Sequence, residues 1–343
     1  MLIQYCLFMN RKLTCQCPIQ LDTVLFTIYY PAADNAIPTK PNHPWVSRPV
    51  ALAAEGYARF AHINNYFIRG IFTVALWAIA GSNTIPAKVD VPLYSNESDP
   101  DVDNSSRNNG PFPVIIFSHG MASSRTSYSQ YCGELASRGY IVVAIEHRDG
   151  SSPATVVKKE GELQKNLLGI TMAYLQEEPH VEMLDLKKGQ LKLRQAEIEE
   201  TVKVLRRIND GQGGEMFEAN TRHEGQYLKR WEGKLDMDQV IMAGHSYGAT
   251  GALQALKGGP FVSTIRPFAA GIILDPGKQS GPLNDDVKVP ILVIHSNSWS
   301  AKPSVFFDRP HFDVVSELVQ GVLKRGKDSW FLTSCSFLAL CCR

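Results

Sequence analysis

The chain has 343 residues, with 35 Lys and Arg against 34 Asp and Glu, so its formal net charge is +1 at neutral pH. Because 44% of the residues are hydrophobic and 20% are charged, the composition is typical of a globular protein and excludes collagen, a coiled coil and a disordered chain. Such a balanced charge gives no overall field to hold a polyanion, so nucleic-acid binding is not expected as the main activity.

The seven cysteines are spread unevenly: three lie before residue 18, three after residue 334, and Cys132 stands between the two groups. This distribution is neither a disulfide framework nor a zinc-ligand pattern, and it favours a reducing compartment. In the first 21 residues apolar side chains precede Arg11 and Lys12, which is the reverse of a secretory signal. We therefore predict a cytoplasmic protein.

The first predicted strand lies at residues 22–32, DTVLFTIYYPA, where β-branched and aromatic residues end at a proline. Residues 66–81, YFIRGIFTVALWAIAG, are apolar but too few to span a membrane comfortably, and they include Arg69. We expect a helix here that contacts lipid on one face, although a fully buried core helix would have the same pattern.

After a polar connector at residues 95–111, short apolar runs rich in β-branched residues alternate with helix-length segments, as in a parallel sheet buried on both faces. The runs are FPVIIFS (112–118), YIVVAI (140–145), VIMA (240–243), AGIIL (270–274) and VPILVI (289–294). The alternation predicts an α/β fold with a mostly parallel, doubly wound sheet in one domain over residues 22–334. Residues 1–21 and 335–343 are atypical tails.

Residues 151–231 interrupt this alternation with a charged segment that we interpret as a helical insertion. Its apolar residues recur at helical spacing: Leu191, Ile198, Val202, Leu205 and Ile208. The pattern predicts a helix laid over the core by one apolar stripe, and a partner-binding helix is the alternative.

The strongest chemical signal is GHSYG at residues 244–248, which follows the run VIMA and opens the helix-like segment GATGALQAL. A nucleophile between a strand and a helix must sit on a very tight turn, and glycine at both flanking positions avoids a Cβ clash. We therefore predict that Ser246 is the nucleophile of an elbow at the carboxyl edge of the sheet. The alternative is a glycine-rich turn with a capping serine.

The attacked ester oxygen becomes an oxyanion, which needs hydrogen-bond donors already in place. The backbone N–H of Tyr247, at the start of a helix, is one candidate, and the N–H of Met121, after the first buried strand, is the other. His119 in the same loop is interpreted as structural, and residues 146–149, EHRD, as a local salt-bridged loop. Asp275 ends a buried strand 29 residues after Ser246, where a carboxylate can orient an imidazole. The alternative is a structural role, because the sequence Asp-Pro-Gly also favours a tight turn.

Three segments in this order resemble the platelet-activating factor acetylhydrolase family of animals and fungi: FSHGMASSRTSYSQYCGELASRGYIVVAIEHRDGSS, GHSYGAT and IILDPG. The likeness covers roughly residues 22–334. It implies an α/β-hydrolase fold and a calcium-independent esterase that removes acetyl, short or oxidised acyl groups from the sn-2 position of phospholipids. It also implies Ser246 as nucleophile, Asp275 as acid, and Met121 and Tyr247 as oxyanion donors. No metal, organic cofactor or obligate protein partner is expected, and a phospholipid is the expected substrate.

The catalytic base is the difficulty. In that family it lies in a Gly-x-x-His type loop after a late strand, which residues 328–334, DSWFLTS, resemble. Here CSFLALCCR follows, and no histidine occurs after His311. We therefore expect a chain truncated before the base and hardly active, because the serine proton has no acceptor. His295, at a strand end, and His311, before a helix, are weak substitutes.

Two other functions are kept as alternatives. One is a general α/β-hydrolase carboxylesterase acting on soluble esters or peptides, because one fold supports many substrates. The other is a non-catalytic binding protein with a hydrolase fold, which the missing histidine supports. An apolar mouth formed by residues 66–79 would favour the lipid esterase.

Overall fold

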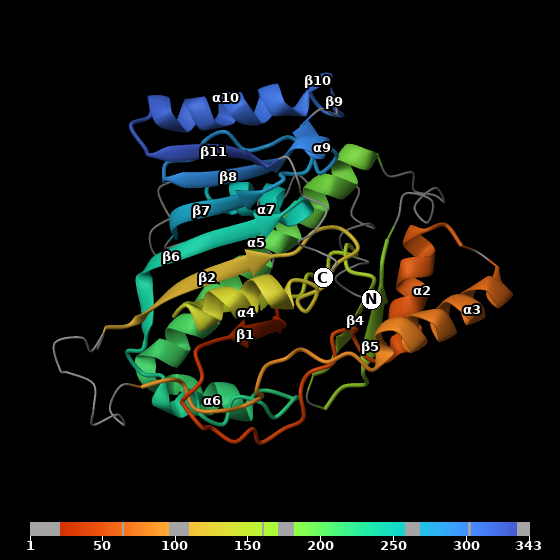
Figure 1. Cartoon of the computed structure of the whole chain (residues 1–343), viewed down its shortest axis with the longest axis vertical. Coiled ribbons are helices and arrows are strands. Elements are labelled where there is room, and N and C mark those ends of the chain that lie inside the picture. The colour runs from red at the N-terminus through yellow and green to blue at the C-terminus, as the bar shows by residue number, and fades with distance from the viewer. Residues whose placement is uncertain are drawn as a thin grey trace.

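One central sheet organises the chain in the computed structural model, which describes residues 21–63, 65–95, 110–159, 161–170, 182–257, 268–300 and 303–334. Within these ranges the strand order is β1 (Phe26–Tyr29), β3 (Ile141–Ile145), β2 (Phe112–Ser118), β6 (Leu235–His245), β7 (Phe268–Leu274), β8 (Ile291–Ser296) and β11 (Ser329–Ser334) (Figure 1). β1 pairs with β3 antiparallel, and each of the other neighbouring pairs is parallel.

The predicted apolar runs are the central strands of this sheet. All five residues of β3 are buried, as are the last five of β2, because helices cover both faces. Side chains alternate along β2: Val114 and Ile116 belong to one core cluster, and Ile115 and Phe117 to the other. The prediction of a mostly parallel α/β sheet is therefore confirmed, and with the strand–elbow–helix arrangement described below it is an α/β-hydrolase fold.

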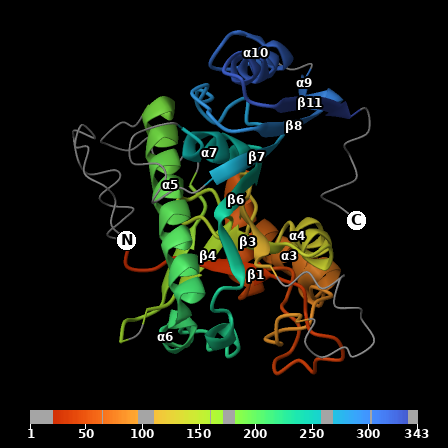
Figure 2. The ribbon, with the colours of Figure 1, turned by 90° about the vertical axis from the view of Figure 1, so that its left-hand side faces the viewer.

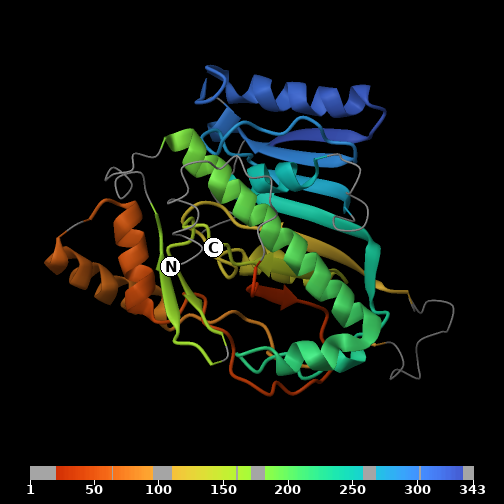
Figure 3. The ribbon, with the colours of Figure 1, turned by 180° about the vertical axis from the view of Figure 1, so that it is seen from behind.

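Helices lie on both sides of the sheet. α5 (Met183–Arg207) and α7 (Tyr247–Ala255) pack on one face, and α4 (Ser129–Ser137) packs on the other (Figure 2). Seen from behind, α5 crosses the sheet obliquely (Figure 3). α10 (His311–Lys324) packs beside β8 and β11 at the far edge.

The insertion at residues 151–231 is not only helical. It begins with an antiparallel hairpin, β4 (Ala154–Val157) and β5 (Lys165–Leu168), and continues into α5, a π-helical turn η5 (Ile208–Gln212), α6 (Gly213–Glu218) and a short 3-10 turn η6 (Leu228–Arg230). The hairpin was not predicted, because each of its strands has only four residues. The apolar stripe of α5 is buried in the core, as the helical spacing indicated.

A helical hairpin stands to one side of the sheet (Figure 1). It consists of α2 (Val50–Phe60), α3 (Tyr66–Leu76) and the π-helical turn η1 (Trp77–Gly81). The remaining short elements are α9 (Asn297–Ser300), β9 (Pro303–Ser304) and β10 (Arg309–Pro310). None of the helices within the described ranges is both long and apolar enough to cross a membrane. Of the predicted tails at 1–21 and 335–343, only residue 21 is described.

Candidate active site

Ser246 occupies a tight turn between β6 and α7. Its backbone has φ 54° and ψ −117°, a conformation that is strained for a residue with a Cβ. A Cβ on Gly248 would lie 1.9 Å from the carbonyl oxygen of Ser118, and one on Gly244 would lie 2.3 Å from that of Gly248. Only glycine therefore fits at either position, which is the backbone geometry predicted for a nucleophile elbow.

The loop after β2 passes directly beside this turn. A Cβ built on Gly120 would lie 3.3 Å from Ser246 Cβ, so the next residue, Met121, is also close to the serine. Among the described residues the Met121 N–H has no acceptor. The N–H of Tyr247 lies in the first turn of α7, where amides have no acceptor within the helix. The loop that carries Met121 thus passes beside Ser246, and Tyr247 follows it directly; their role as oxyanion donors stays a prediction.

Tyr128 joins this loop to the elbow, and sequence reasoning missed it. Its hydroxyl is 2.7 Å from Nδ1 of His245 and accepts a hydrogen bond of 3.3 Å from the N–H of Gly120. The residue before the nucleophile is therefore tied to the residue before Met121. No feature of the surrounding sequence marks this tyrosine.

Asp275 lies at the same edge, on the neighbouring strand. His245 and Leu274 are paired in the parallel register of β6 and β7, so Ser246 and Asp275 follow directly after two paired residues. The Ser246 N–H donates to the carbonyl of Leu274 at 2.9 Å, and one carboxylate oxygen of Asp275 accepts from Ser296 N–H at 2.6 Å. The structure thus brings together the predicted nucleophile and the predicted acid, with the acid held by the end of β8.

Neither weak substitute for the base joins them. His295 and His311 are buried, with ring centres 5.4 Å apart, and Nε2 of His311 is 2.7 Å from the carbonyl oxygen of Pro276. Burial lowers the pKa of His295 to about 4, although the charge of Asp275 opposes that shift. In the described part of the chain, no imidazole is hydrogen-bonded to Ser246 or Asp275.

β11, which corresponds to the late strand that precedes the base in the family, ends at the edge of the sheet where the base would be needed. β11 runs parallel to β8, with Ser334 paired with Ser296, so it ends at the edge where Asp275 lies. A loop leaving β11 would start beside the candidate acid. The departure from the family pattern was predicted at residues 335–343, which lie outside the described residues.

A buried guanidinium supports the site from α5. Arg194 is 0% exposed; its Nε donates to Asp149 at 2.7 Å, and Nη1 donates to the carbonyl of His119 at 2.8 Å and to Ser118 Oγ at 3.1 Å. Burial alone would raise the pKa of Asp149, but Arg194 and the hydrogen bonds from Ser151 hold it below its ordinary value. Residues 146–149 are therefore salt-bridged, but not to one another: His147, Arg148 and Asp149 pair with α5, and Glu146 pairs with Arg125.

A second chain of serine, histidine and carboxylate lies beneath the elbow. Ser118 Oγ is 2.7 Å from Nε2 of His147, and Nδ1 of His147 is 2.8 Å from Glu197. All three residues are 0% exposed. Burial lowers the pKa of His147 well below its ordinary value and raises that of Glu197 to about 7, although Arg148 opposes the second shift. The connectivity is that of a catalytic triad, but without access for a substrate the group is structural.

Sequence reasoning missed Arg194 and Glu197, although a signal existed. Both lie on the face of α5 that carries the apolar stripe, with Arg194 three residues after Leu191 and Glu197 just before Ile198. Charged residues within an apolar stripe must be paired when the stripe is buried. Within the described ranges, no group of three His, Cys, Asp or Glu side chains is placed to hold a metal ion.

Comparison with known proteins identifies the family of the chain. The family model described as platelet-activating factor acetylhydrolase, isoform II, matches residues 14–309. The dog platelet-activating factor acetylhydrolase is 33% identical over 196 residues, which are 57% of this chain and 39% of the relative. The guinea-pig protein is 29% identical over 273 residues, covering 79% of this chain and 54% of its own length. The chain thus matches about half the length of these relatives or less.

Solved structures show more distant similarity. A ferulic acid esterase from Streptomyces cinnamoneus is 18% identical, with a TM-score of 0.42 over 90% of this chain and 65% of its own. Thermogutta terrifontis esterase 2 is 14% identical, with a TM-score of 0.37 over 66% of this chain and 72% of its own. The sheet order and the elbow define the fold of this chain without them.

Proposed function

Because the chain belongs to the platelet-activating factor acetylhydrolase, isoform II, family, we propose that it is a calcium-independent serine esterase. Its proposed substrates are phospholipids like platelet-activating factor, with an acetyl or short acyl group at the sn-2 position. The observation that carries the proposal is the strained Ser246 turn, with the amides of Met121 and Tyr247 beside it and Asp275 on the next strand.

In the proposed reaction Ser246 Oγ bonds to the carbonyl carbon of the sn-2 ester. The carbonyl oxygen becomes an oxyanion, which the amides of Met121 and Tyr247 and the positive end of α7 stabilise. The bond to the glycerol oxygen then breaks, and the lysophospholipid leaves with the proton that Ser246 gave up. Water hydrolyses the acyl-serine and regenerates the hydroxyl.

The proton step requires a base, and Asp275 can act only through an imidazole. The proposal therefore includes low activity for the 343-residue chain and full activity once a histidine loop follows β11. The same observation favours the second candidate function, a non-catalytic binding protein of the same fold, because no imidazole links Ser246 and Asp275 in the described ranges.

We propose α3 as the contact with a lipid surface. No residue of α3 is buried, so the fully buried core helix is wrong. The exposed apolar side chains on α3 and the turn after it are Tyr66, Phe67, Ile68, Ile71, Val74, Trp77 and Ile79. An exposed apolar surface of this kind marks an interaction site. The amphipathic helix α3, which carries this surface, is suited to lie in a membrane interface.

The hairpin of α2 and α3 is also joined to the oxyanion loop. A Cβ on Gly56 of α2 would lie 1.8 Å from the carbonyl oxygen of Pro153, so the two segments touch. In the same segment, the carbonyl of Ser151 accepts from the N–H of Ala122, next to Met121. The hairpin that carries α3 therefore contacts, through α2, the segment that holds the oxyanion loop, which supports a phospholipid over a soluble ester.

Two assays test the proposal, each with the 343-residue chain, which should be hardly active, and with a chain extended by a histidine loop after β11. Hydrolysis of a short-acyl phospholipid and of p-nitrophenyl acetate is followed with calcium chelated, and Ser246→Ala is the control. Turnover of the phospholipid that needs Ser246 supports the lipid esterase; turnover of the soluble ester alone supports a general carboxylesterase. If a chain extended with a histidine loop binds phospholipid but hydrolyses neither substrate, the binding protein is the better description.

Vesicle binding tests α3 separately. Phe67→Ser with Trp77→Ser should lower binding to phosphatidylcholine vesicles about tenfold, because each exposed aromatic contributes apolar area at the interface. In a chain extended with the histidine loop, labelling of Ser246 by a fluorophosphonate should not change. Ile37→Ser, also exposed but outside the hairpin, is the matched control. Unchanged vesicle binding by the double variant contradicts a role for α3.

The predicted cytoplasmic location is part of the same proposal. Among the described residues Cys132 is a buried free thiol, as expected in a reducing compartment. Fractionation of cells that express the tagged full chain tests the location directly.

A further inference from the structure

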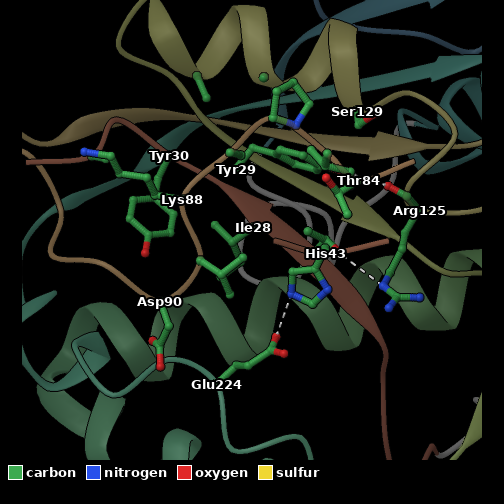
Figure 4. A pocket seen from close by; sticks show the side chains of 18 of the residues that line it. Ile28, Tyr29, Tyr30, His43, Thr84, Lys88, Asp90, Arg125, Ser129 and Glu224 are labelled. Carbon is green, nitrogen blue, oxygen red and sulfur yellow. Dashed lines mark hydrogen bonds and ion pairs between the residues drawn. The ribbon is translucent and has the colours of Figure 1, made fainter. Parts of the chain in front are cut away.

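A cavity of about 1120 Å³ lies beside β1, apart from the candidate active site (Figure 4). Its walls come from β1, residues 83–91, the loop before α4 with α4 itself, and residues 220–231. Ser246, Asp275 and Met121 are not among the lining residues. Pockets for small ligands usually measure ~300–1000 Å³, so this space can hold one lipid-sized molecule.

Most of the lining is apolar. Aromatic and aliphatic side chains surround the space: Phe26, Ile28, Tyr30, Ile85, Val89, Val91, Leu228 and Trp231. Trp231 is 2% exposed and stacks edge-on against Tyr30, with ring centres 5.0 Å apart, so this wall is rigid. Such a wall suits a long hydrocarbon chain.

Two cations in the lining, Lys88 and Arg222, have hydrogen-bond donors without an acceptor among the described residues. Arg222 is half-buried, and within the described ranges its guanidinium makes one hydrogen bond, 3.3 Å from Nη2 to the carbonyl of Val156. A guanidinium has five N–H donors. Burial and the nearby charge of Arg125 lower the pKa of Arg222, and the charges of Glu224 and Glu146 oppose that shift.

The acidic residues of the lining already have partners. Glu224 is paired with His43 at 3.2 Å (Figure 4), and Asp90 accepts from the N–H groups of Gly225 and Gln226 at 2.9 and 3.1 Å. Arg125, by contrast with Arg222, donates from Nε to Thr27 at 2.9 Å and pairs with Glu146. Lys88, the other cation of the lining with spare donors, has no partner among the described residues but is exposed, so the half-buried Arg222 is the better placed of the two to bind an anion inside the cavity.

We infer that this cavity binds a single-chain amphiphile with an anionic head, whose hydrocarbon chain lies along the β1 wall and whose carboxylate or phosphate bonds to Arg222. A fatty carboxylate and a lysophospholipid share this chemistry. The site is distinct from the ester-cleaving one, but it connects with it, since Tyr128 lines the cavity and bonds to both His245 and Gly120.

Calorimetry tests this with Ser246→Ala in the full chain, so that no hydrolysis is needed and failure of the proposed esterase does not affect the result. The probes are dodecanoate, lauroyl lysophosphatidylcholine and dodecanol, each kept below its aggregation limit. One molecule of dodecanoate or of the lysophospholipid should bind per chain. Binding of only one of the two identifies a free acid or a phospholipid as the source.

Variants then locate the binding. Arg222→Gln should weaken dodecanoate and the lysophospholipid, whose carboxylate or phosphate the guanidinium would bind, about tenfold or more, as for a charge-assisted hydrogen bond, and should leave dodecanol unchanged. Thr84→Trp, at an exposed lining position, should weaken all three probes by filling the space. Arg230→Gln, a nearby arginine outside the lining, is the control and should change nothing. No saturable binding, or binding that both lining variants leave intact, overturns the inference.

Discussion

Two serines end neighbouring strands at the same edge of the sheet, and they differ in every property that matters for catalysis. Ser246 is half-buried on a strained turn, with two amides and a carboxylate beside it but no bonded histidine in the described ranges. Ser118 is fully buried at the end of β2, where the backbone is not strained. Its hydroxyl is hydrogen-bonded to a histidine, which is in turn hydrogen-bonded to a glutamate. The comparison teaches that hydrogen-bond connectivity alone does not make a nucleophile; access and oxyanion donors decide.

The largest effect is expected when Ser246 receives a histidine partner, which Ser118 already has. A chain whose sequence continues after Ser334 with a Gly-x-x-His loop should hydrolyse a short-acyl phospholipid roughly 10⁴ times faster than the 343-residue chain, since removing a triad member typically costs ~10⁴-fold or more. The rate is measured with calcium chelated. The same loop with Gln in place of His is the control. Equal, Ser246-dependent rates for both loops would assign the base to a histidine already in the chain.

The buried network that surrounds Ser118 should matter for stability. Arg194→Met leaves Asp149 as an uncompensated buried charge and should lower the free energy of unfolding by about 3–5 kcal/mol. Adding Asp149→Asn should recover part of the loss, because the stranded charge is then gone. Urea denaturation followed by tryptophan fluorescence measures both. A loss under 1 kcal/mol for the single variant would show that Arg194 is not needed.

Burial of the histidines in this network predicts how stability depends on pH. His119 has a folded pKa of about 4, lowered by burial and by Arg194, against 6.5 when unfolded. Between pH 4 and 6.5 the unfolded chain therefore binds the proton, and stability should rise with pH by up to ~3 kcal/mol from this residue. Glu197, whose pKa is raised to about 7, acts in the opposite direction between pH 4.5 and 7.

Urea midpoints measured across pH 4 to 7 check both signs. His119→Gln should flatten the rise, and Glu197→Gln should steepen it. A wild-type midpoint that falls as the pH increases from 4 to 6 would contradict the dominance of the buried histidines.

The smallest effect separates the two serines directly. Ser118→Ala removes hydrogen bonds to His147 and Arg194 and should lower the free energy of unfolding by about 1–3 kcal/mol. In a chain extended with the histidine loop, fluorophosphonate labelling should continue after Ser118→Ala, whereas Ser246→Ala abolishes it. Mass spectrometry of labelled peptides identifies the reacting serine, and a label on Ser118 would reverse the assignment.

Much of the fold and part of the site could be predicted, because their signals are local. The buried parallel strands are recognisable as short runs rich in β-branched residues. The elbow is recognisable as a serine between two glycines at the junction of a strand and a helix. Arg194 could not be assigned a role, since its partner Asp149 lies 45 residues away and only the docking of α5 brings them together. The exposure of α3 was equally hidden, because an apolar helix can be core or surface until its neighbours are known.

Arg194 also constrains the order in which the chain can fold. It joins α5 to the end of β2 across a sequence separation of 76 residues, and contacts this distant form slowly because the intervening loop must close first. The strands β2 and β3 can pair earlier, since a much shorter segment connects them. Docking of α5 supplies the donors for the hydrogen bonds that the Ser118 hydroxyl and the His119 carbonyl accept, and so completes the loop that carries Met121.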